Sequence, residues 1–201
     1  MKNSEKEGVL DNTKTEKVSW NVDNVHSKIG FSVRHMVISE VTGRFNSFKM
    51  TVVSPKDEFE TSQIEVIIDA NSIETSVADR NNHLKSDDFF NVEKFPEIKF
   101  KSKSFVKIGE EDFKLTGDLT IRDVTKEITL DVVFGGQIKD PWGNIRAGFK
   151  VSGSIDRYDY NVKFNSPLEA GGFALSKKVT INCDLELESE MLNCIIHFWV
   201  D

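Results

Sequence analysis

Apolar and polar residues alternate with a period of two through most of this chain. From Lys28 to His35 every second side chain lies on one mixed apolar face, and Gln63 to Ala70 shows the cleaner form of the same pattern. Such alternation is typical of a β-strand with one buried and one wet face. The sequence predicts about eight strands. They fall at 28–35, 43–53, 63–70, from 98 onward, 115–121, 128–134, 147–155 and 179–187.

Turn signals between these segments favour an all-β sandwich or barrel. They occur at 109–112, 122–126 and 135–143. The run Asp140-Pro141-Trp142-Gly143 predicts a turn, because Pro presets φ and Gly accepts a positive φ. Small residues on the predicted inward faces are expected to leave space inside and to let strands bend. These residues are Ala70, Gly117, Ala147 and Gly153.

One segment, Ser76 to Phe90, departs from the alternation and predicts a short helix. Ser76 and Asp79 resemble a capping box with Asp in place of Glu. His83 and Asp87 are four residues apart and therefore share a face of such a helix. Because the segment lies between early and middle strands, we expect the helix to cover one end of a barrel.

The chain is expected to form a single domain, because β-barrels of about 200 residues commonly stay undivided. Residues 1–17 are polar and charged and predict a disordered lead-in. The barrel domain is expected at 18–190. Residues 191–201 form an apolar tail, for which a dimer contact, a plug and an artefact of the coding region are open interpretations.

The charge and composition exclude several classes of protein. A net charge of -7 disfavours nucleic-acid binding and steady attachment to anionic membranes. No apolar stretch approaches the ~20 residues of a membrane helix, so we expect no stable membrane insertion. The polar start predicts a cytoplasmic protein, or a periplasmic one if a signal has been removed. The 15 Phe residues suit a dry interior, and the two cysteines are expected to be reduced thiols.

Candidate chemistry is sparse. His26, His35 and His83 could supply imidazole ligands to a metal, with Asp87 as a fourth ligand. Their spacing is not that of a metal motif, so we predict no metal. The motif G-x-S-x-G and a phosphate-cradling glycine loop are both missing from the sequence. We therefore predict no catalytic residue and no cofactor. An enzyme that uses His35 or His83 as an acid or base stays open as an alternative.

Several short motifs, in order, resemble the YceI-like family of lipocalin-like polyisoprenoid-binding proteins. The opening run is His26 to His35, and the most recognisable segment is Asp79 to Phe90. The resemblance covers roughly Val18 to Glu188. The other matching segments are 43–45, 73–75, 94–96, 98–100, 117–121, 124–126 and 146–149.

The resemblance implies an extended eight-stranded antiparallel barrel with a long apolar tunnel. It also implies non-catalytic binding, storage or transport of a polyisoprenoid or another long amphiphile, with a fatty acid or fatty amide as an alternative, and often a homodimer. For the head group of such a ligand the candidates are Arg34, Arg80 and Arg146. The residues expected to line the tunnel are Phe31, Val33, His35, Phe45, Phe89, Phe100, Leu119, Ile121, Phe134, Trp142, Phe149 and Val151.

Overall fold

A computed structural model of the chain describes residues 17–55, 58–169 and 171–190. The expected lead-in, except Lys17, and the apolar tail at 191–201 lie outside these described residues, so both stay predictions. None of the helices in the described part is long and apolar enough to cross a membrane.

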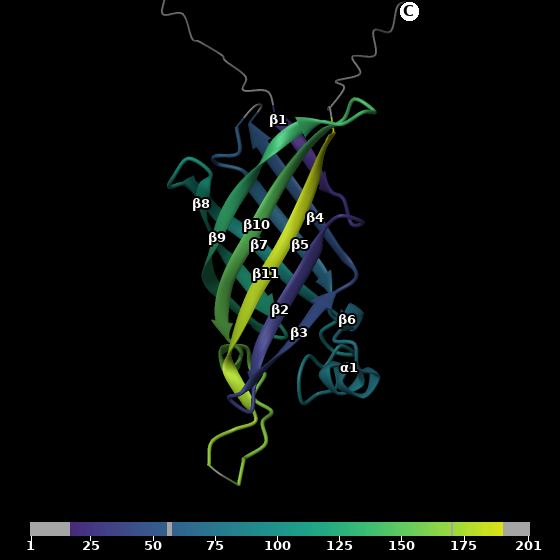
Figure 1. Cartoon of the computed structure of the whole chain (residues 1–201), viewed down its shortest axis with the longest axis vertical. Coiled ribbons are helices and arrows are strands. Elements are labelled where there is room, and N and C mark those ends of the chain that lie inside the picture. The colour runs from purple at the N-terminus through teal and green to yellow at the C-terminus, as the bar shows by residue number, and fades with distance from the viewer. Residues whose placement is uncertain (1–16, 56–57, 170, 191–201) are drawn as a thin grey trace, which may run out of the picture.

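The described residues form strands along most of their length, with one α-helix at one end (Figure 1). The helices are η1 (Ala70–Ser72), α1 (Ala78–Lys85) and η2 (Arg157–Tyr160). The strands are β1 (Lys17–Val22), β2 (Lys28–His35), β3 (Ser39–Phe45), β4 (Phe48–Pro55), β5 (Gln63–Asp69), β6 (Ile73–Glu74), β7 (Glu97–Lys107), β8 (Asp112–Ile121), β9 (Val124–Lys139), β10 (Ile145–Asp156) and β11 (Leu175–Glu190).

The strands form a closed antiparallel barrel. Successive parts of β11 pair with β1 and β2, which therefore act as the two halves of one broken strand. β4 pairs with β1 and β3 pairs with β2, so β3 and β4 are the halves of the second strand. β5 pairs with β4 and β6 pairs with β3, so β5 and β6 are the halves of the third. Counting each broken strand once leaves eight strands in chain order, closed by β11 on the first. The predicted eight-stranded antiparallel barrel is confirmed.

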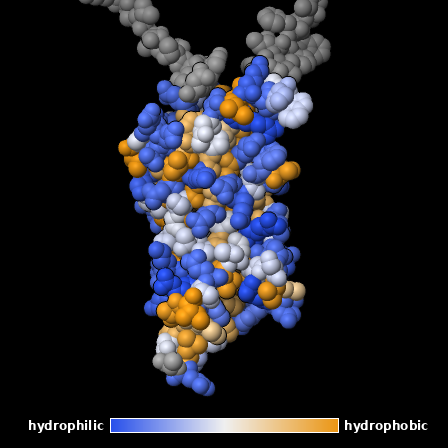
Figure 2. Space-filling model, in the orientation of Figure 1, coloured by the Kyte–Doolittle hydropathy of each residue, from blue (hydrophilic) through white to orange (hydrophobic). Residues whose placement is uncertain are grey.

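The period-two pattern places apolar side chains inside the barrel and charged ones outside. Along β5, Ile64, Val66 and Ile68 are buried while their polar neighbours are exposed. On the outer wall Lys101 pairs with Glu65 at 2.8 Å. Exposed pairs of this kind stabilise a fold by ~1 kcal/mol or less each, so the buried interior carries most of the stability. Figure 2 shows a mainly hydrophilic wall with apolar colour gathered near the lower end.

The helix is shorter than the sequence predicts. It begins after Val77, which makes no capping hydrogen bond through its side chain, and Ser76 takes a left-handed φ of 64°. The predicted capping box is therefore wrong. The turn is held by Asn81, whose buried amide oxygen accepts from the Thr75 N–H at 2.9 Å and the Thr75 hydroxyl at 2.6 Å.

Several strand boundaries also differ from the prediction. No strand is predicted over β1, whose first residue, Lys17, falls in the predicted lead-in. The predicted strand 43–53 is broken at Asn46–Ser47 into β3 and β4. β9 continues through Gly135 and Gly136 to Lys139, so the predicted turn 135–143 is much narrower. Gly136 has a φ of 109°, close to a register shift in the pairing with β10, which indicates a β-bulge.

Candidate ligand-binding cavity

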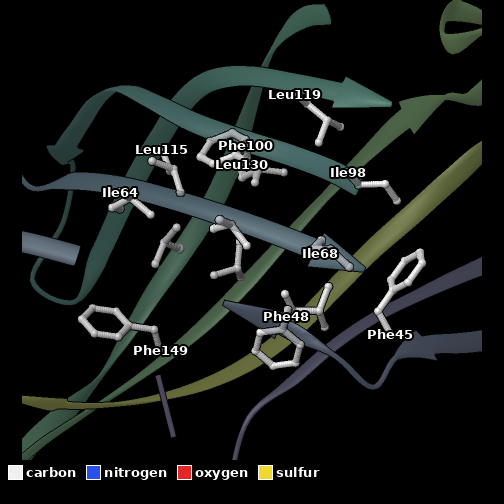
Figure 3. Close-up of a cluster of buried hydrophobic side chains, with 14 of the residues drawn as sticks. Phe45, Phe48, Ile64, Ile68, Ile98, Phe100, Leu115, Leu119, Leu130 and Phe149 are labelled. Carbon is white, nitrogen blue, oxygen red and sulfur yellow. The ribbon is translucent and has the colours of Figure 1, made fainter. Parts of the chain in front are cut away.

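The barrel encloses a cavity of about 520 Å³. Small-molecule sites typically measure about 300–1,000 Å³, so the volume suits a ligand rather than a few waters. The lining is almost wholly apolar and draws on every strand except β1 and the short β6. Figure 3 shows side chains from several strands, among them Ile64, Ile98 and Leu130, gathered inside the barrel.

One end of the barrel is filled by aromatic rings. Phe59, from the loop between β4 and β5, lies 5.0 Å from Trp20, 5.5 Å from Phe134 and 4.9 Å from Phe149, measured between ring centroids. The indole N–H of Trp20 donates to the buried Ser54 hydroxyl at 2.9 Å. We call this the aromatic end.

The cavity reaches solvent at the opposite end, near α1. On β2, Ile29 is buried, whereas Phe31, Val33 and His35 are half-buried as the strand approaches α1. On β11, Leu187 is buried and the inward residues from 185 back to 175 are half-buried. All of these side chains line the cavity, so their increasing exposure marks a mouth at the α1 end.

The rim of this mouth is built by α1 and the segment that follows η2. His83 from α1 stacks edge-on with Phe164 at 4.7 Å and with Phe89 at 5.0 Å. Its Nε2 lies 2.8 Å from Oδ2 of Asp88. The predicted partner Asp87 lies beyond the end of the helix and instead pairs with Arg122 at 3.0 Å. The prediction that His83 and Asp87 share a helix face is therefore wrong.

Arg80 projects from α1 into the cavity lining. Its Nε donates to the Thr75 hydroxyl at 2.8 Å, and its Nη2 to the Thr75 carbonyl at 2.5 Å. Thr75 is fixed in turn by Asn81. Arg80 is therefore a positioned cation at the mouth, with hydrogen bonds that hold its guanidinium against the barrel wall.

Two polar residues in the lining were missed by the sequence reasoning. Arg157 and Tyr160, the first and last residues of η2, are buried, with 6% and 1% of their surface exposed. Burial lowers the pKa of the Arg157 guanidinium and raises the pKa of Tyr160 to about 12. An Arg and a Tyr three residues apart after an apolar strand form no distinctive motif, so the sequence carried no signal for them.

Cys183 also lines the cavity, from β11. Burial raises the pKa of its thiol to about 11. The thiol is therefore protonated at neutral pH, and it acts as a small apolar surface rather than a nucleophile.

The inward glycines do not open the cavity, contrary to the prediction. A Cβ on Gly117 would lie 2.5 Å from Cζ of Phe100, and one on Gly153 would lie 2.4 Å from Cδ2 of Leu130. Larger neighbours already fill the space above both glycines. An eight-stranded barrel is wide enough to hold one small ligand, so the cavity does not require space above these glycines.

The structure brings most of the predicted tunnel residues into the lining. Whether they contact a ligand stays a prediction. Those in the lining are Phe31, Val33, His35, Phe45, Phe89, Phe100, Leu119, Ile121, Phe149 and Val151, together with Arg80.

Four predicted site residues lie elsewhere. Phe134 packs in the aromatic end, 5.2 Å from Phe149. Trp142 lies in the turn after β9 and is 81% exposed, because that turn points away from the barrel. Arg34 is exposed, since the alternation of β2 directs it opposite to Val33. Arg146 occupies an acidic cluster outside the cavity.

That cluster surrounds a single guanidinium. Arg146 Nε donates to Asp140 at 2.9 Å, and its Nη1 donates to Asp23 and to Glu186, each at 2.7 Å. Its Nη2 lies 3.3 Å from Glu188. These hydrogen bonds raise the pKa of Arg146. Burial alone would raise the pKa of Asp140, but hydrogen bonds from Arg146 and the backbone outweigh it and lower the value overall.

Within the described residues one group has the spacing of a metal site, and it belongs to this cluster. It consists of Asp23, His26 and Glu186. Arg146 already forms salt bridges with both carboxylates, and these salt bridges explain why the carboxylates lie close together. His35 and His83 line the cavity at its other end, and the structure does not bring them together with His26.

The comparisons with known proteins agree with this geometry. Residues 20–187 match the family model described as a YceI-like domain. A UPF0312 protein of Staphylococcus aureus (strain N315) is 37% identical over 169 residues, which cover 84% of this chain and 96% of that protein.

Solved structures show the same fold. The YCEI protein of Campylobacter jejuni is 32% identical, with a TM-score of 0.66 over 84% of this chain and 96% of that one. Burkholderia cenocepacia BcnA gives a TM-score of 0.72 at 21% identity, over 82% and 98% of the two chains. A polyisoprenoid binding domain from Saccharophagus degradans gives 0.59 at 18% identity, over 86% and 99%. The chain belongs to the YceI-like family.

Proposed function

We propose that this protein binds a long-chain amphiphile, such as a polyisoprenoid, inside its barrel and stores or carries it without chemical change. The observation that carries the proposal is the cavity of about 520 Å³, which is lined almost entirely by apolar side chains and reaches solvent at one end. The polyisoprenoid binding domain from Saccharophagus degradans, which has the same fold, supports this class of ligand.

The energetics favour an apolar chain. Each methylene group moved from water into the lining contributes ~0.8 kcal/mol. The ordering of a flexible ligand offsets part of this gain. A fatty acid or fatty amide would bind by the same mechanism, and it remains the alternative ligand class.

A binding role without catalysis is supported by the chemistry of the lining. Cys183 is held protonated by its burial and is therefore a poor nucleophile, whereas the pair of His83 with Asp88 leaves one acid–base group in the lining. A His-dependent enzyme therefore stays the lesser alternative, and a turnover abolished by His35→Ala would favour it. The homodimer and the cytoplasmic location stay predictions.

The direct test is extraction of the protein, purified from its own source, with organic solvent, followed by mass spectrometry. We expect a long-chain apolar or amphiphilic compound in stoichiometric amount. Extracts without lipid, from a protein that also takes up no geranylgeraniol in solution, would contradict the proposal and favour a ligand-free structural role.

A steric test uses the lining itself. Leu119→Trp and Phe149→Trp add volume inside the cavity, so we expect at least ~10-fold weaker binding of geranylgeraniol, since overpacking costs about 1–3 kcal/mol. Lys150→Trp places the same side chain on the outer face beside Phe149 and should leave binding unchanged. Uptake that persists in both inward variants, with circular dichroism showing a retained fold, would mean that the ligand binds elsewhere.

A further inference from the structure

Two hydrogen-bond donors inside the apolar cavity have no partner in the described part of the protein. They are Nη2 of Arg157 and the hydroxyl of Tyr160. Both residues line the cavity, and both are more than nine-tenths buried. A buried donor without a partner costs about 1–3 kcal/mol, and more when the group is charged, so such groups are rarely kept without a use.

The rest of the Arg157 guanidinium is fixed by backbone carbonyls. Its Nε donates to Ser176 at 2.9 Å, and its Nη1 donates to Val162 and Phe164, each at 2.8 Å. These bonds tie η2 to the segments on either side of the mouth. They hold the guanidinium rigid and leave only the Nη2 N–H groups for another acceptor.

No described carboxylate forms an ion pair with Arg157. The neighbouring Asp156 accepts from the Tyr158 N–H at 2.9 Å, where it caps η2. In contrast, Arg146 on the outer face is surrounded by four carboxylates. The positive charge of Arg157 is therefore stabilised by backbone dipoles, by the Tyr158 ring at 4.8 Å and by Asp156 at longer range, without a direct ion pair among the described residues.

The local geometry of η2 places the two residues on one face of the helix. In a 3-10 helix, side chains three residues apart project from the same face, and Arg157 and Tyr160 have this spacing. Since burial keeps the phenol protonated, Tyr160 offers a neutral O–H and Arg157 offers the charged N–H groups of its Nη2. Two oxygens of a carboxylate or phosphate fit such a pair of donors.

We propose that Arg157 and Tyr160 form a site for the acidic head group, a carboxylate or a phosphate, of the ligand held in the barrel. This proposal rests on the proposed function, and it deepens that function by naming the chemistry of the ligand's head group. It replaces Arg34 and Arg146, which lie outside the cavity, and it differs from Arg80, whose Nε and Nη2 are both engaged by Thr75.

The test compares ligands with the same chain and different heads. Geranylgeranyl phosphate is measured against geranylgeraniol, and palmitate against hexadecanol, by displacement of the neutral dye N-phenyl-1-naphthylamine. We expect the wild type to bind at least one acidic ligand about 10-fold or more tightly than its alcohol, because a hydrogen bond to a charged group is worth about 1.5–3 kcal/mol. Which pair shows the preference distinguishes phosphate from carboxylate.

Tyr160→Phe is the decisive variant, because it removes only a hydroxyl that has no partner in the described protein. Its fold should be retained without ligand, and its preference for the acid should fall about 10-fold while the alcohols bind as before. Arg157→Gln should abolish the preference too, although it also removes backbone contacts. Tyr158→Phe is the control from the same helix, since it keeps the ring that packs on Arg157 and removes a hydroxyl of a residue outside the cavity lining, where it accepts from Asn165.

Three results would overturn the site. The first is equal affinity of the wild type for acids and alcohols, which leaves the proposed function intact. The second is an acid preference that survives Tyr160→Phe and Arg157→Gln but is lost in Arg80→Gln, which would move the head group to the mouth. The third is binding of none of the four ligands to the wild type, which would remove the proposed function together with the site.

Discussion

Gly117 shows at the scale of single residues how the interior is packed. Its missing side chain is replaced by the ring of Phe100, which reaches across from β7, and the Lys101 carbonyl closes the remaining space. Gly43 under Phe31 has the same arrangement. Such covering of a strand glycine by a neighbouring aromatic ring lets the wall bend without leaving a void.

We expect Gly117→Ala to lower the free energy of unfolding by about 1–3 kcal/mol, because the new Cβ would meet backbone that cannot move aside. A Cβ on Gly148 has no atom within 4 Å, so Gly148→Ala is the matched control and should change stability by about 0.5 kcal/mol or less. Urea denaturation of both variants checks this. Equal stability of the two would show that the packing around Gly117 can relax.

The periodicity predicted correctly that Gly117 and Gly153 face inward. It could not predict what lies above them, because alternation records the direction of a side chain and not the identity of its neighbours across strands. The same limit explains Arg146 and Arg157. Arg146 was expected at the mouth and lies among carboxylates. Arg157 is buried in the lining, and the sequence did not single it out.

At the scale of elements, Arg146 joins parts of the barrel that are distant in sequence. It projects from β10 to Asp140 in the β9–β10 turn, to Asp23 in the β1–β2 turn, and to Glu186 on β11. The two turns and two strands meet around one cation. Asp23 has its pKa held well below the ordinary range, by its hydrogen bond with His26 first and by Arg146 second.

A carboxyl whose pKa is lowered by folding stabilises the fold above its unfolded pKa of ~4 and loses that contribution as the pH falls toward its folded pKa. We therefore expect the free energy of unfolding to drop between about pH 5 and pH 2. In Asp23→Asn this acid dependence should be shallower, and stability at pH 7 should be lower. Chemical denaturation across this pH range is the measurement. An unchanged slope would show that Asp23 is not stabilised by Arg146 and His26.

Most elements followed from the sequence because their alternation is long and regular. β1 was missed although Val18, Trp20 and Val22 alternate, because the strand is short and follows a charged stretch. The helix was predicted too long, because Asp87 and Asp88 resemble a polar helix face but belong to the turns after α1. Such boundaries depend on tertiary contacts like the pair between Asp87 and Arg122.

At the scale of the whole molecule, the inward residues of β2 and β11 change from buried to half-buried toward the mouth. Cys183 lies within this gradient, half-buried and in the lining. Alternation predicted the closed wall, but a packed core and a cavity have the same binary pattern. The predicted cavity rested on the small inward residues, whose glycines are covered by larger neighbours, and on the resemblance to the YceI-like family.

Cys183 can report on what fills the cavity. In Cys194→Ser it is the single thiol, and its pKa of about 11 should make labelling at pH 8 about 100-fold slower than that of an ordinary cysteine. Bound geranylgeraniol should slow labelling further by covering the thiol. A labelling rate unaffected by saturating ligand would place that ligand outside the cavity. Reaction with a thiol-specific dye, followed by absorbance, gives both rates.

The pairing of β11 with β1 has a consequence for how the chain folds. Ser19 pairs with Glu190 and Lys28 with Asp184, so the ring joins both halves of its first strand to β11, while the other walls form from strands that follow one another in the chain. Contacts of such long separation form slowly, because a large loop must close before they contribute. During synthesis the Phe-rich inner face therefore stays uncovered until the final strand leaves the ribosome, and that interval is when the protein is most prone to aggregate.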